Sequence, residues 1–387
     1  MKYLFISLLM IGLSVHSNKA NAAGTPEVKS RVMRKEGTDT GKISQNYSEA
    51  VLQEVYADAD YQLAGVAISP KGRLFVSYPF WLDKHSYSVV EIGSDKKPHP
   101  FPDDAWNSFQ KGDDGSQKFV SVQAVYADEK NNLWILDPAN IGFGDVYQQS
   151  NKLVEVDLNT NKVKRIIRFS ADVAGSKSFL NDIRIDNAHG FAYLSNTTLG
   201  GLVIVDLNTG KSRAVLNGHT SASTDPAYHF TMNGKELATP QGVFKANTDG
   251  IALSPDNAWV YYKSLTDNHL YRVSTNTLRE FSSTESEVEG HVEKVGDFVT
   301  SDGMVFDSRG NLYLGDIENA RIVRISPDKQ MTTLIEDKEK LIWPDSYAIG
   351  KDGYLYITCS QIHEMLFFNN GENKTQYPYR VFKLKIN

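Results

Sequence analysis

Apolar segments and short polar turns alternate along most of the chain in a pattern that repeats six times. Each copy has an apolar strand, a polar turn and a second strand built around an aromatic residue. These aromatic positions are Phe75, Trp134, Tyr193, Tyr261, Tyr313 and Tyr356, and their spacing varies from 43 to 68 residues. A repeat of this length, with apolar and polar residues alternating along each strand, is typical of propeller blades joined by unequal loops. The pattern predicts an all-β, six-bladed β-propeller.

Further strands follow the aromatic strand in most copies. Alternating apolar residues predict third strands such as 153–158 and 202–207, and polar turns lead from these to fourth strands at 163–169 and 212–216. The last copy ends after a third strand, so its outer edge lacks a partner. The apolar segment 50–56 precedes the first blade. We expect this segment to supply the missing fourth strand and to close the ring.

The first residues have the three parts of a secretory signal peptide. A lysine precedes an apolar run at 3–15, and Ala20-Asn21-Ala22 has the small residues of a cleavage site. We therefore expect residues 1–22 to be removed on export, which gives a secreted or periplasmic protein with no membrane span in its mature chain. An uncleaved anchor is the alternative, although the run is short for a span. Residues 23–47 are mostly polar and predict a flexible arm, and residues 48–387 are assigned to the propeller.

Charge, cysteine content and failed motifs limit the classes of partner. The formal net charge is −6, and loss of Lys2 and Lys19 with the signal peptide changes it to −8. No basic cluster with interleaved aromatic residues is present, so nucleic acid is not an expected partner. Gly210-Lys211-Ser212 lacks the earlier glycine of a phosphate-binding loop, and no organic cofactor is expected. Cys359 is the single cysteine, so the fold cannot use an internal disulfide. The oligomeric state stays open.

Superposition of the six copies aligns one position at the start of each inner strand. These positions are Ala64, Gln123, Asn181, Asp249, Asp302 and Asp345. The inner strands of a propeller line its channel, so three carboxylates and two amides are expected to meet at the channel mouth. Such oxygen ligands suit Ca²⁺ or another hard divalent cation. In an enzyme the three aspartates would act as general bases or metal ligands, and the two amides would polarise a carbonyl. The alternative is that each aspartate caps its adjoining turn, as Asp-Gly pairs often do.

Aromatic and amide side chains are predicted to surround this ring. Phe80, Trp81, Asn196 and Trp343 lie in segments that should return to the same face. Aromatic rings with a few polar groups suit a small polar or aromatic ligand. Packing of one loop against the next is the alternative for these residues. The long connection at 217–248 is expected to enter at this face and to act as a lid.

Four phrases of the sequence resemble the yellow and major royal jelly protein family, in a bacterial version. They are GRLFVSYPFW at 72–81, FLNDI at 179–183, DGIALS at 249–254 and WPD at 343–345. The resemblance covers about residues 50–385. It implies a secreted six-bladed propeller, in a family that includes pigment-pathway proteins described as dopachrome tautomerases and salivary binders of biogenic amines. A family of this kind does not fix one chemistry.

A more distant similarity is to gluconolactonases and regucalcin, which are six-bladed propellers with a metal site of one Glu, two Asn and one Asp. This similarity implies Asn181, Asp249 and Asp302 as metal ligands. Ala64 stands where the Glu would lie, so Asp345 or Gln123 would have to complete the coordination. We therefore expect an exported propeller that binds a small polar or aromatic metabolite, with tautomerase-type chemistry. A metal-dependent lactone hydrolase and a non-catalytic ligand-binding protein are the alternatives.

Overall fold

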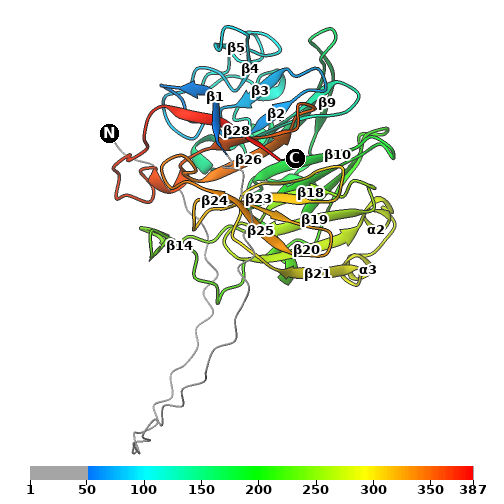
Figure 1. Cartoon of the computed structure of the whole chain (residues 1–387). Coiled ribbons are helices and arrows are strands. Elements are labelled where there is room, and N and C mark those ends of the chain that lie inside the picture. Colours follow the sequence, from blue (N-terminus) through cyan, green and yellow to red (C-terminus); the bar gives the residue numbers. More distant parts are fainter. Residues whose placement is uncertain (1–50, 387) are drawn as a thin grey trace, which may run out of the picture. The chain divides into compact units, whose positions relative to one another are not determined.

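A computed structural model describes residues 51–386, which form six four-stranded antiparallel sheets around a central channel (Figure 1). The inner strands of blades 1 to 6 are β2 (Val66–Ile68), β6 (Ala124–Ala127), β10 (Leu180–Asp186), β18 (Thr248–Leu253), β22 (Met304–Phe306) and β26 (Pro344–Ile349). Each inner strand contacts the next, and β26 contacts β2, so the ring is closed. The predicted all-β, six-bladed fold is confirmed.

Three further strands follow in each blade, from the channel to the outside. The second strands are β3 (Leu74–Ser77), β7 (Asn132–Asp137), β11 (Phe191–Asn196), β19 (Trp259–Ser264), β23 (Leu312–Asp316) and β27 (Tyr354–Cys359). The third strands are β4 (Val89–Ile92), β8 (Lys152–Asp157), β12 (Leu202–Asp206), β20 (His269–Ser274), β24 (Arg321–Ile325) and β28 (Tyr379–Lys385). The fourth strands of blades 1 to 5 are β5 (Pro98–Pro100), β9 (Lys162–Arg168), β13 (Ser212–Val215), β21 (Val292–Asp297) and β25 (Met331–Glu336). Helices among the described residues are short: α1 (Ala171–Ala174), α2 (Thr275–Arg279) and α3 (Glu285–Glu289).

The sixth blade takes its outer strand from the start of the domain. Strand β1 (Gln53–Asp58) pairs antiparallel with β28, and the strand order in this sheet is β1-β28-β27-β26. Leu52 and Tyr56 are buried and pack into apolar clusters at the two sides of the blade. The predicted closure by the segment before the first blade is confirmed. Because β1 pairs with the outer edge of β28, the third strand of this blade is hydrogen-bonded on both sides.

The recurring aromatic residue is tied to the turn between the first two strands of its blade. In blade 2, Asp128 accepts hydrogen bonds from the Asn132 backbone N–H at 2.8 Å and from Trp134 Nε1 at 2.9 Å. In blade 5, Asp307 accepts a hydrogen bond from the Tyr313 hydroxyl at 3.1 Å. The aromatic ring is buried between blades while its polar atom stays paired, as a buried donor requires. This arrangement explains the aspartate that precedes the aromatic residue by six or seven positions in blades 2, 3 and 5.

A hydroxyl at the end of the second strand connects neighbouring blades beside the channel. Gly65 N–H donates to Ser77 Oγ at 2.8 Å, and Ser77 Oγ donates to the Gln123 carbonyl of blade 2 at 2.7 Å. Thr358 in blade 6 donates in the same way to the Ala64 carbonyl of blade 1. These bonds satisfy backbone groups that the sheets leave free at the channel.

Three inner strands contain a β-bulge at their channel end. The register shifts over residues 180–183 of β10, 248–251 of β18 and 344–347 of β26. A bulge leaves residues unpaired and turns their side chains away from the regular alternation. Each of these bulges holds one of the predicted ring residues: Asn181, Asp249 or Asp345.

The predicted signal peptide at 1–22 and most of the chain before β1, including the arm at 23–47, lie outside the described residues. In the part that is described, no helix has the length and apolar character that a membrane crossing requires. Cys359 ends β27 and is buried, and it forms no disulfide.

Candidate functional site

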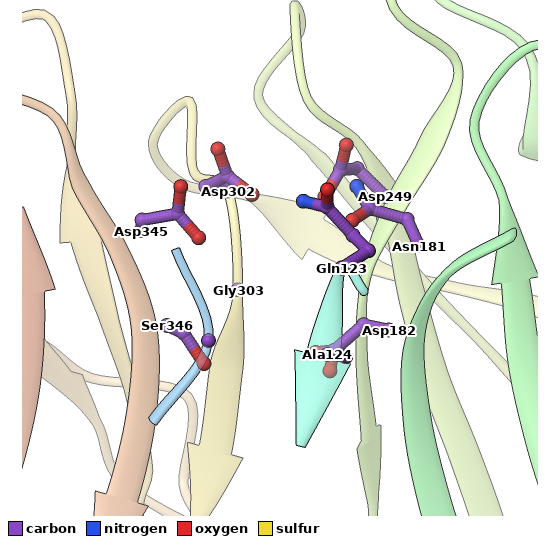
Figure 2. Close-up of a pocket in the computed structure, with 10 residues that line it drawn as sticks. Gln123, Ala124, Asn181, Asp182, Asp249, Asp302, Gly303, Asp345 and Ser346 are labelled. Atoms are coloured by element: carbon purple, nitrogen blue, oxygen red, sulfur yellow. The ribbon is translucent and has the colours of Figure 1, made fainter. Parts of the chain in front are cut away.

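Five of the six predicted ring residues line one small space in the channel. They are Gln123, Asn181, Asp249, Asp302 and Asp345. Figure 2 shows Asp302 and Asp345 on one side of this space, facing the other three residues. All five are buried. The space has a volume of about 10 Å³, which is room for about one water molecule or ion. An organic metabolite therefore does not fit between these residues as they stand.

Side-chain hydrogen bonds hold the ring in place. Asn181 Nδ2 donates to Thr197 Oγ1 at 3.1 Å, and Thr197 Oγ1 donates to Asp249 Oδ2 at 3.1 Å. Trp343 Nε1 donates to Asp302 Oδ2 at 2.8 Å. Within residues 51–386 no backbone N–H bonds to the carboxylates of Asp249, Asp302 or Asp345. Turn capping therefore does not account for these aspartates.

The glycines that follow two of the aspartates allow the blades to approach one another. Gly303 N–H donates to the Asp345 carbonyl at 2.8 Å, and a Cβ added at Gly303 would lie 2.7 Å from that carbonyl oxygen. A Cβ at Gly250 would collide in the same way with the Asp302 carbonyl oxygen. Neither glycine has a positive φ. The Asp-Gly pairs reflect close backbone contact between blades and not the chemistry of a tight turn.

Burial raises the pKa of all three ring carboxyls. The pKa of Asp249 rises to about 6, although a hydrogen bond from Asp302 opposes the rise. The pKa of Asp345 rises to about 7, and the charges of Asp249 and Asp182 add to the effect of burial. The pKa of Asp302 lies well above its ordinary value because the group is buried and faces the charges of Asp249 and Asp345. Burial and mutual repulsion therefore favour the protonated forms of these carboxyls near neutral pH.

Positive groups lie near the ring but are bound elsewhere. Lys263 is buried, and its Nζ donates to the carbonyls of Ser264 at 2.5 Å and Asp267 at 2.9 Å. Burial lowers the pKa of Lys263 to about 8. Across residues 51–386, no ion pair involves Asp249, Asp302 or Asp345. The ring carboxylates are therefore compensated by protons or by a cation from outside the chain.

An arginine, Arg184, lies beside the ring in β10, the inner strand that also holds Asn181. Arg184 Nη1 donates to Asp182 Oδ1 at 3.0 Å, and its Nη2 reaches from blade 3 to the Met304 carbonyl of blade 5 at 2.5 Å. Figure 2 shows Asp182 below the carboxylates and Asn181. Neither residue was singled out from the sequence. The available signal was an Asp-x-Arg pair inside a strand that lines the channel.

The donor atoms of the ring suit a hard cation, although no finished metal cage is present. Gln123 Oε1 and Asp345 Oδ2 are buried without a hydrogen-bond partner. No group of three His, Cys, Asp or Glu side chains between residues 51 and 386 is spaced to hold a metal ion. A cation here would need amide oxygens together with carboxylates, as calcium sites commonly use. In its donor chemistry the ring fits such an ion.

Apolar side chains cover the ring on the mouth side, and we call this cluster the apolar cap. Its buried members are Ala64, Trp81, Phe230, Leu237, Ala246, Leu265, Ile317, Trp343, Ile362 and Met365. Trp81 stacks on Phe143 with ring centroids 4.9 Å apart, and Phe230 meets the edge of Trp343 at 5.8 Å. Trp81 and Trp343 thus pack against other loops, the alternative that the sequence left open. A ligand that approaches the ring from the side of Trp343 would have to displace these packed side chains.

Two predicted ligand-binding residues lie outside the ring and the cap. Phe80 stacks on His85 at 4.4 Å and belongs to a separate cluster with Phe109. The Asn196 side chain accepts a hydrogen bond from the Phe179 N–H at 3.2 Å, so it fixes the backbone next to Thr197. The structure gives these two side chains local packing and hydrogen-bonding partners.

Comparison with known proteins gives similarities in sequence and in fold. The family model described as major royal jelly protein matches residues 120–387. Major royal jelly protein 3 of Apis mellifera is 29% identical over 281 residues, which cover 65% of this chain and 49% of that protein. A 6-deoxy-6-sulfogluconolactonase of Pseudomonas putida is 30% identical over 153 residues, or 36% of this chain and 46% of that protein.

Solved structures of other proteins are similar to this chain in fold. Regucalcin of Agrobacterium tumefaciens, described as a calcium-binding protein, superposes with a TM-score of 0.51 at 14% identity, over 86% of this chain and 96% of that chain. Identity this low shows a common propeller fold and no more. The chain spans about half the length of major royal jelly protein 3. Because the family model covers more than half of the sequence, the chain belongs to the major royal jelly protein family.

Proposed function

We propose that the polar ring binds one hard divalent cation, with Ca²⁺ as the first candidate, and that a small polar or aromatic ligand binds at this position when the cap opens. The observation that carries the proposal is the pair of unpaired buried oxygens, Gln123 Oε1 and Asp345 Oδ2. They line a space for about one ion, together with carboxylates that have no bonded cation. A bound cation would take the place of the protons that now compensate these carboxylates.

The comparisons support this proposal without deciding the ligand. Regucalcin, described as calcium-binding, shares the fold, and a sulfogluconolactonase is similar in sequence over part of the chain. In this ring Ala64 is apolar and buried, so it can supply no side-chain oxygen. Asp345 and Gln123 offer the oxygens that complete a donor set with Asn181, Asp249 and Asp302.

The ring residues can also move a proton. A bound cation would polarise a carbonyl or a water molecule, which lactone hydrolysis requires. The chain itself supplies an acid and a base, because burial and the charges of Asp249 and Asp345 raise the pKa of Asp302 well above its ordinary value, while the pKa of Asp249 rises to about 6. An ionised Asp249 can accept a proton from a ligand while Asp302 or Asp345 returns one.

A metal-free, tautomerase-type reaction is the second candidate, and the raised pKa values of the neighbouring ring carboxyls Asp249 and Asp302 favour it. Tautomerisation needs only a positioned acid and base, so this activity would survive a chelator, whereas lactone hydrolysis would not. A non-catalytic binding protein would show saturable binding without product. The residues at 1–22 support export, and we propose that the mature chain acts outside the cytoplasm.

The test is the thermal unfolding of the chain from Ala23, stripped of metal, with and without Ca²⁺. We compare it with Asp249→Asn/Asp302→Asn and with Asp83→Asn/Asp145→Asn, a control that removes the same charge from exposed positions. An ion at about a hundredfold above its dissociation constant adds about 2.7 kcal/mol if it binds only the folded state. Ca²⁺ should stabilise the wild type and the control but not the ring variant. Equal responses in all three proteins, or none in the wild type, would contradict the proposal.

A further inference from the structure

Residues 223–246, between blades 3 and 4, carry two small hairpins. The first pairs β14 (Thr231–Met232) with β15 (Lys235–Glu236), and the second pairs β16 (Ala238–Thr239) with β17 (Gly242–Val243). Each hairpin forms a sheet of its own, and neither joins a blade. In Figure 1 the hairpin of β14 projects from the propeller on the same side as the orange-red loop before β28. This segment can therefore move without breaking any pairing between strands of a blade.

The inner side of the segment forms part of the apolar cap. Phe230, Leu237 and Ala246 are buried members of the cap, and Phe230 packs on Trp343. Trp343 in turn donates its hydrogen bond to Asp302 of the ring. A continuous contact therefore runs from the segment to a ring carboxyl. Displacement of Phe230 would uncover the Trp343 ring directly above that carboxyl.

The two ends of the segment are bonded to blade 4, where Asp225 N–H donates to Asp267 Oδ2 and Ala246 N–H donates to Thr266 Oγ1, both at 3.0 Å. One carboxylate of blade 5 attaches its middle part. Glu318 lies just after β23 in blade 5, and its Oε1 accepts hydrogen bonds from Thr231 N–H at 2.7 Å and Thr231 Oγ1 at 2.9 Å. Its Oε2 accepts hydrogen bonds from the Tyr228 hydroxyl at 2.8 Å and from Thr300 Oγ1 at 3.1 Å. Three of these four donors belong to the segment. Hydrogen bonds to a charged acceptor are among the stronger ones in proteins.

We propose that residues 223–246 are a lid that controls entry to the ring, and that Glu318 is its latch. The lid closes the mouth side through Phe230. Its ends stay anchored to blade 4, and the latch holds its middle part through one side chain of blade 5. The identity of the ligand that enters past the lid rests on the proposed function, but the opening motion of residues 223–246 does not. Ligand binding and lid opening can therefore be tested separately.

The experiment follows amide hydrogen exchange of the metal-free protein in wild type, Glu318→Ala and Glu236→Ala. Glu236 is the matched control because its carboxylate pairs with His229 inside the lid and does not reach the blades. We expect lid amides to exchange on the order of tenfold faster in Glu318→Ala, since a lost hydrogen bond to a charged acceptor shifts an opening equilibrium by about that factor. Blade amides, and the lid of the control, should keep the wild-type rate.

A second variant, Tyr228→Phe, removes one latch bond from the lid side and should give a smaller acceleration in the same amides. The association rate of Ca²⁺ should rise with lid exchange across the series, while it stays at the wild-type value in the control. Unchanged lid exchange in Glu318→Ala, or equal acceleration in the blades, would overturn the lid. Faster lid exchange in a protein that binds no Ca²⁺ would support the lid and contradict the cation site.

Discussion

The indole Nε1 of Trp343 donates a hydrogen bond to Asp302 Oδ2 across 2.8 Å, and both residues are buried. The bond links the apolar cap to the ring, because Trp343 belongs to the cap and Asp302 lines the central space. It also opposes, in part, the rise of the Asp302 pKa that burial causes. Trp343 therefore fixes the orientation of this carboxyl and eases its ionisation.

Replacement of Trp343 by Phe should weaken Ca²⁺ binding at the ring. Without the indole donor the Asp302 pKa rises further, so a proton competes better with the cation. We expect a dissociation constant on the order of tenfold higher at neutral pH, as a lost bond to a charged acceptor predicts. Isothermal titration would measure it, with Trp259→Phe as a control, because Trp259 begins the second strand of blade 4 at the end away from the ring. An unchanged affinity in Trp343→Phe would show that the indole does not act on the cation site.

The ring should make the metal-free protein less stable as the pH rises. Burial raises the pKa of Asp345 from its ordinary value of 3.8 to about 7 in the folded state, so between these values the folded state binds a proton that the unfolded state does not. Its contribution is fully present below the unfolded pKa and is lost as the pH rises through the folded pKa. The slope for one such carboxyl is about 1.4 kcal/mol per pH unit.

Chemical denaturation across this pH range would measure the effect. Asp345→Asn cannot titrate, so its free energy of unfolding should fall less steeply with pH than that of the wild type. The exposed variant Asp145→Asn should follow the wild-type curve. Parallel curves for Asp345→Asn and the wild type would mean that Asp345 does not carry a raised pKa.

Alanine at Gly250 or Gly303 should destabilise the fold and weaken the site together. The new Cβ would press on the carbonyl of the next blade's ring residue, and misfits of this kind cost about 1–3 kcal/mol. Gly290→Ala is the control, since its added Cβ would meet its nearest neighbour at 3.3 Å near the end of α3. Urea denaturation gives the stability, and a Ca²⁺ titration gives the affinity. A neutral Gly303→Ala would mean that the blades are free to move apart at the ring.

Removal of residues 51–58 should abolish cooperative unfolding of the propeller. The deletion takes away β1, exposes the edge of β28 and removes the buried side chains of Leu52 and Tyr56. Without β1, blade 6 loses its outer strand and the propeller loses the strand that joins the start of the domain to its last blade. Calorimetry of the shortened chain beside the wild type measures the loss. A truncated protein that melts at the wild-type temperature would contradict this role of β1.

The sequence predicted the fold, its closing strand and the ring, but only part of the apolar cap. Repetition predicted six blades, and counting back from equivalent strand ends placed Gln123, Asp249 and Asp345 together, because each inner strand repeats the same geometry. Trp81, Trp343 and the connection at 217–248 were expected at this face, but the rest of the cap could not be predicted in this way. Ile362 and Met365 reach it from a loop with no repeat, and contacts between loops depend on their three-dimensional paths.

The role of the Asp-Gly pairs also required the structure. From the sequence alone, Gly303 could serve a turn or a close backbone contact, and the two interpretations use the same residues. A Cβ added at Gly303 would lie too close to the Asp345 carbonyl oxygen, which shows that the glycine serves a close backbone contact. The same limit applies to Arg184, whose partner Met304 is 120 residues away in the chain.

Proton release on Ca²⁺ binding tests the central claim most directly. Titration calorimetry in two buffers of different ionisation enthalpy counts the protons that leave when Ca²⁺ binds. If the cation displaces the protons held by Asp302 and Asp345, the wild type binds Ca²⁺ near neutral pH with net proton release, and Asp249→Asn/Asp302→Asn shows neither. Absence of Ca²⁺ binding in the wild type, or binding and proton release that survive in the double variant, would contradict a cation site at the ring.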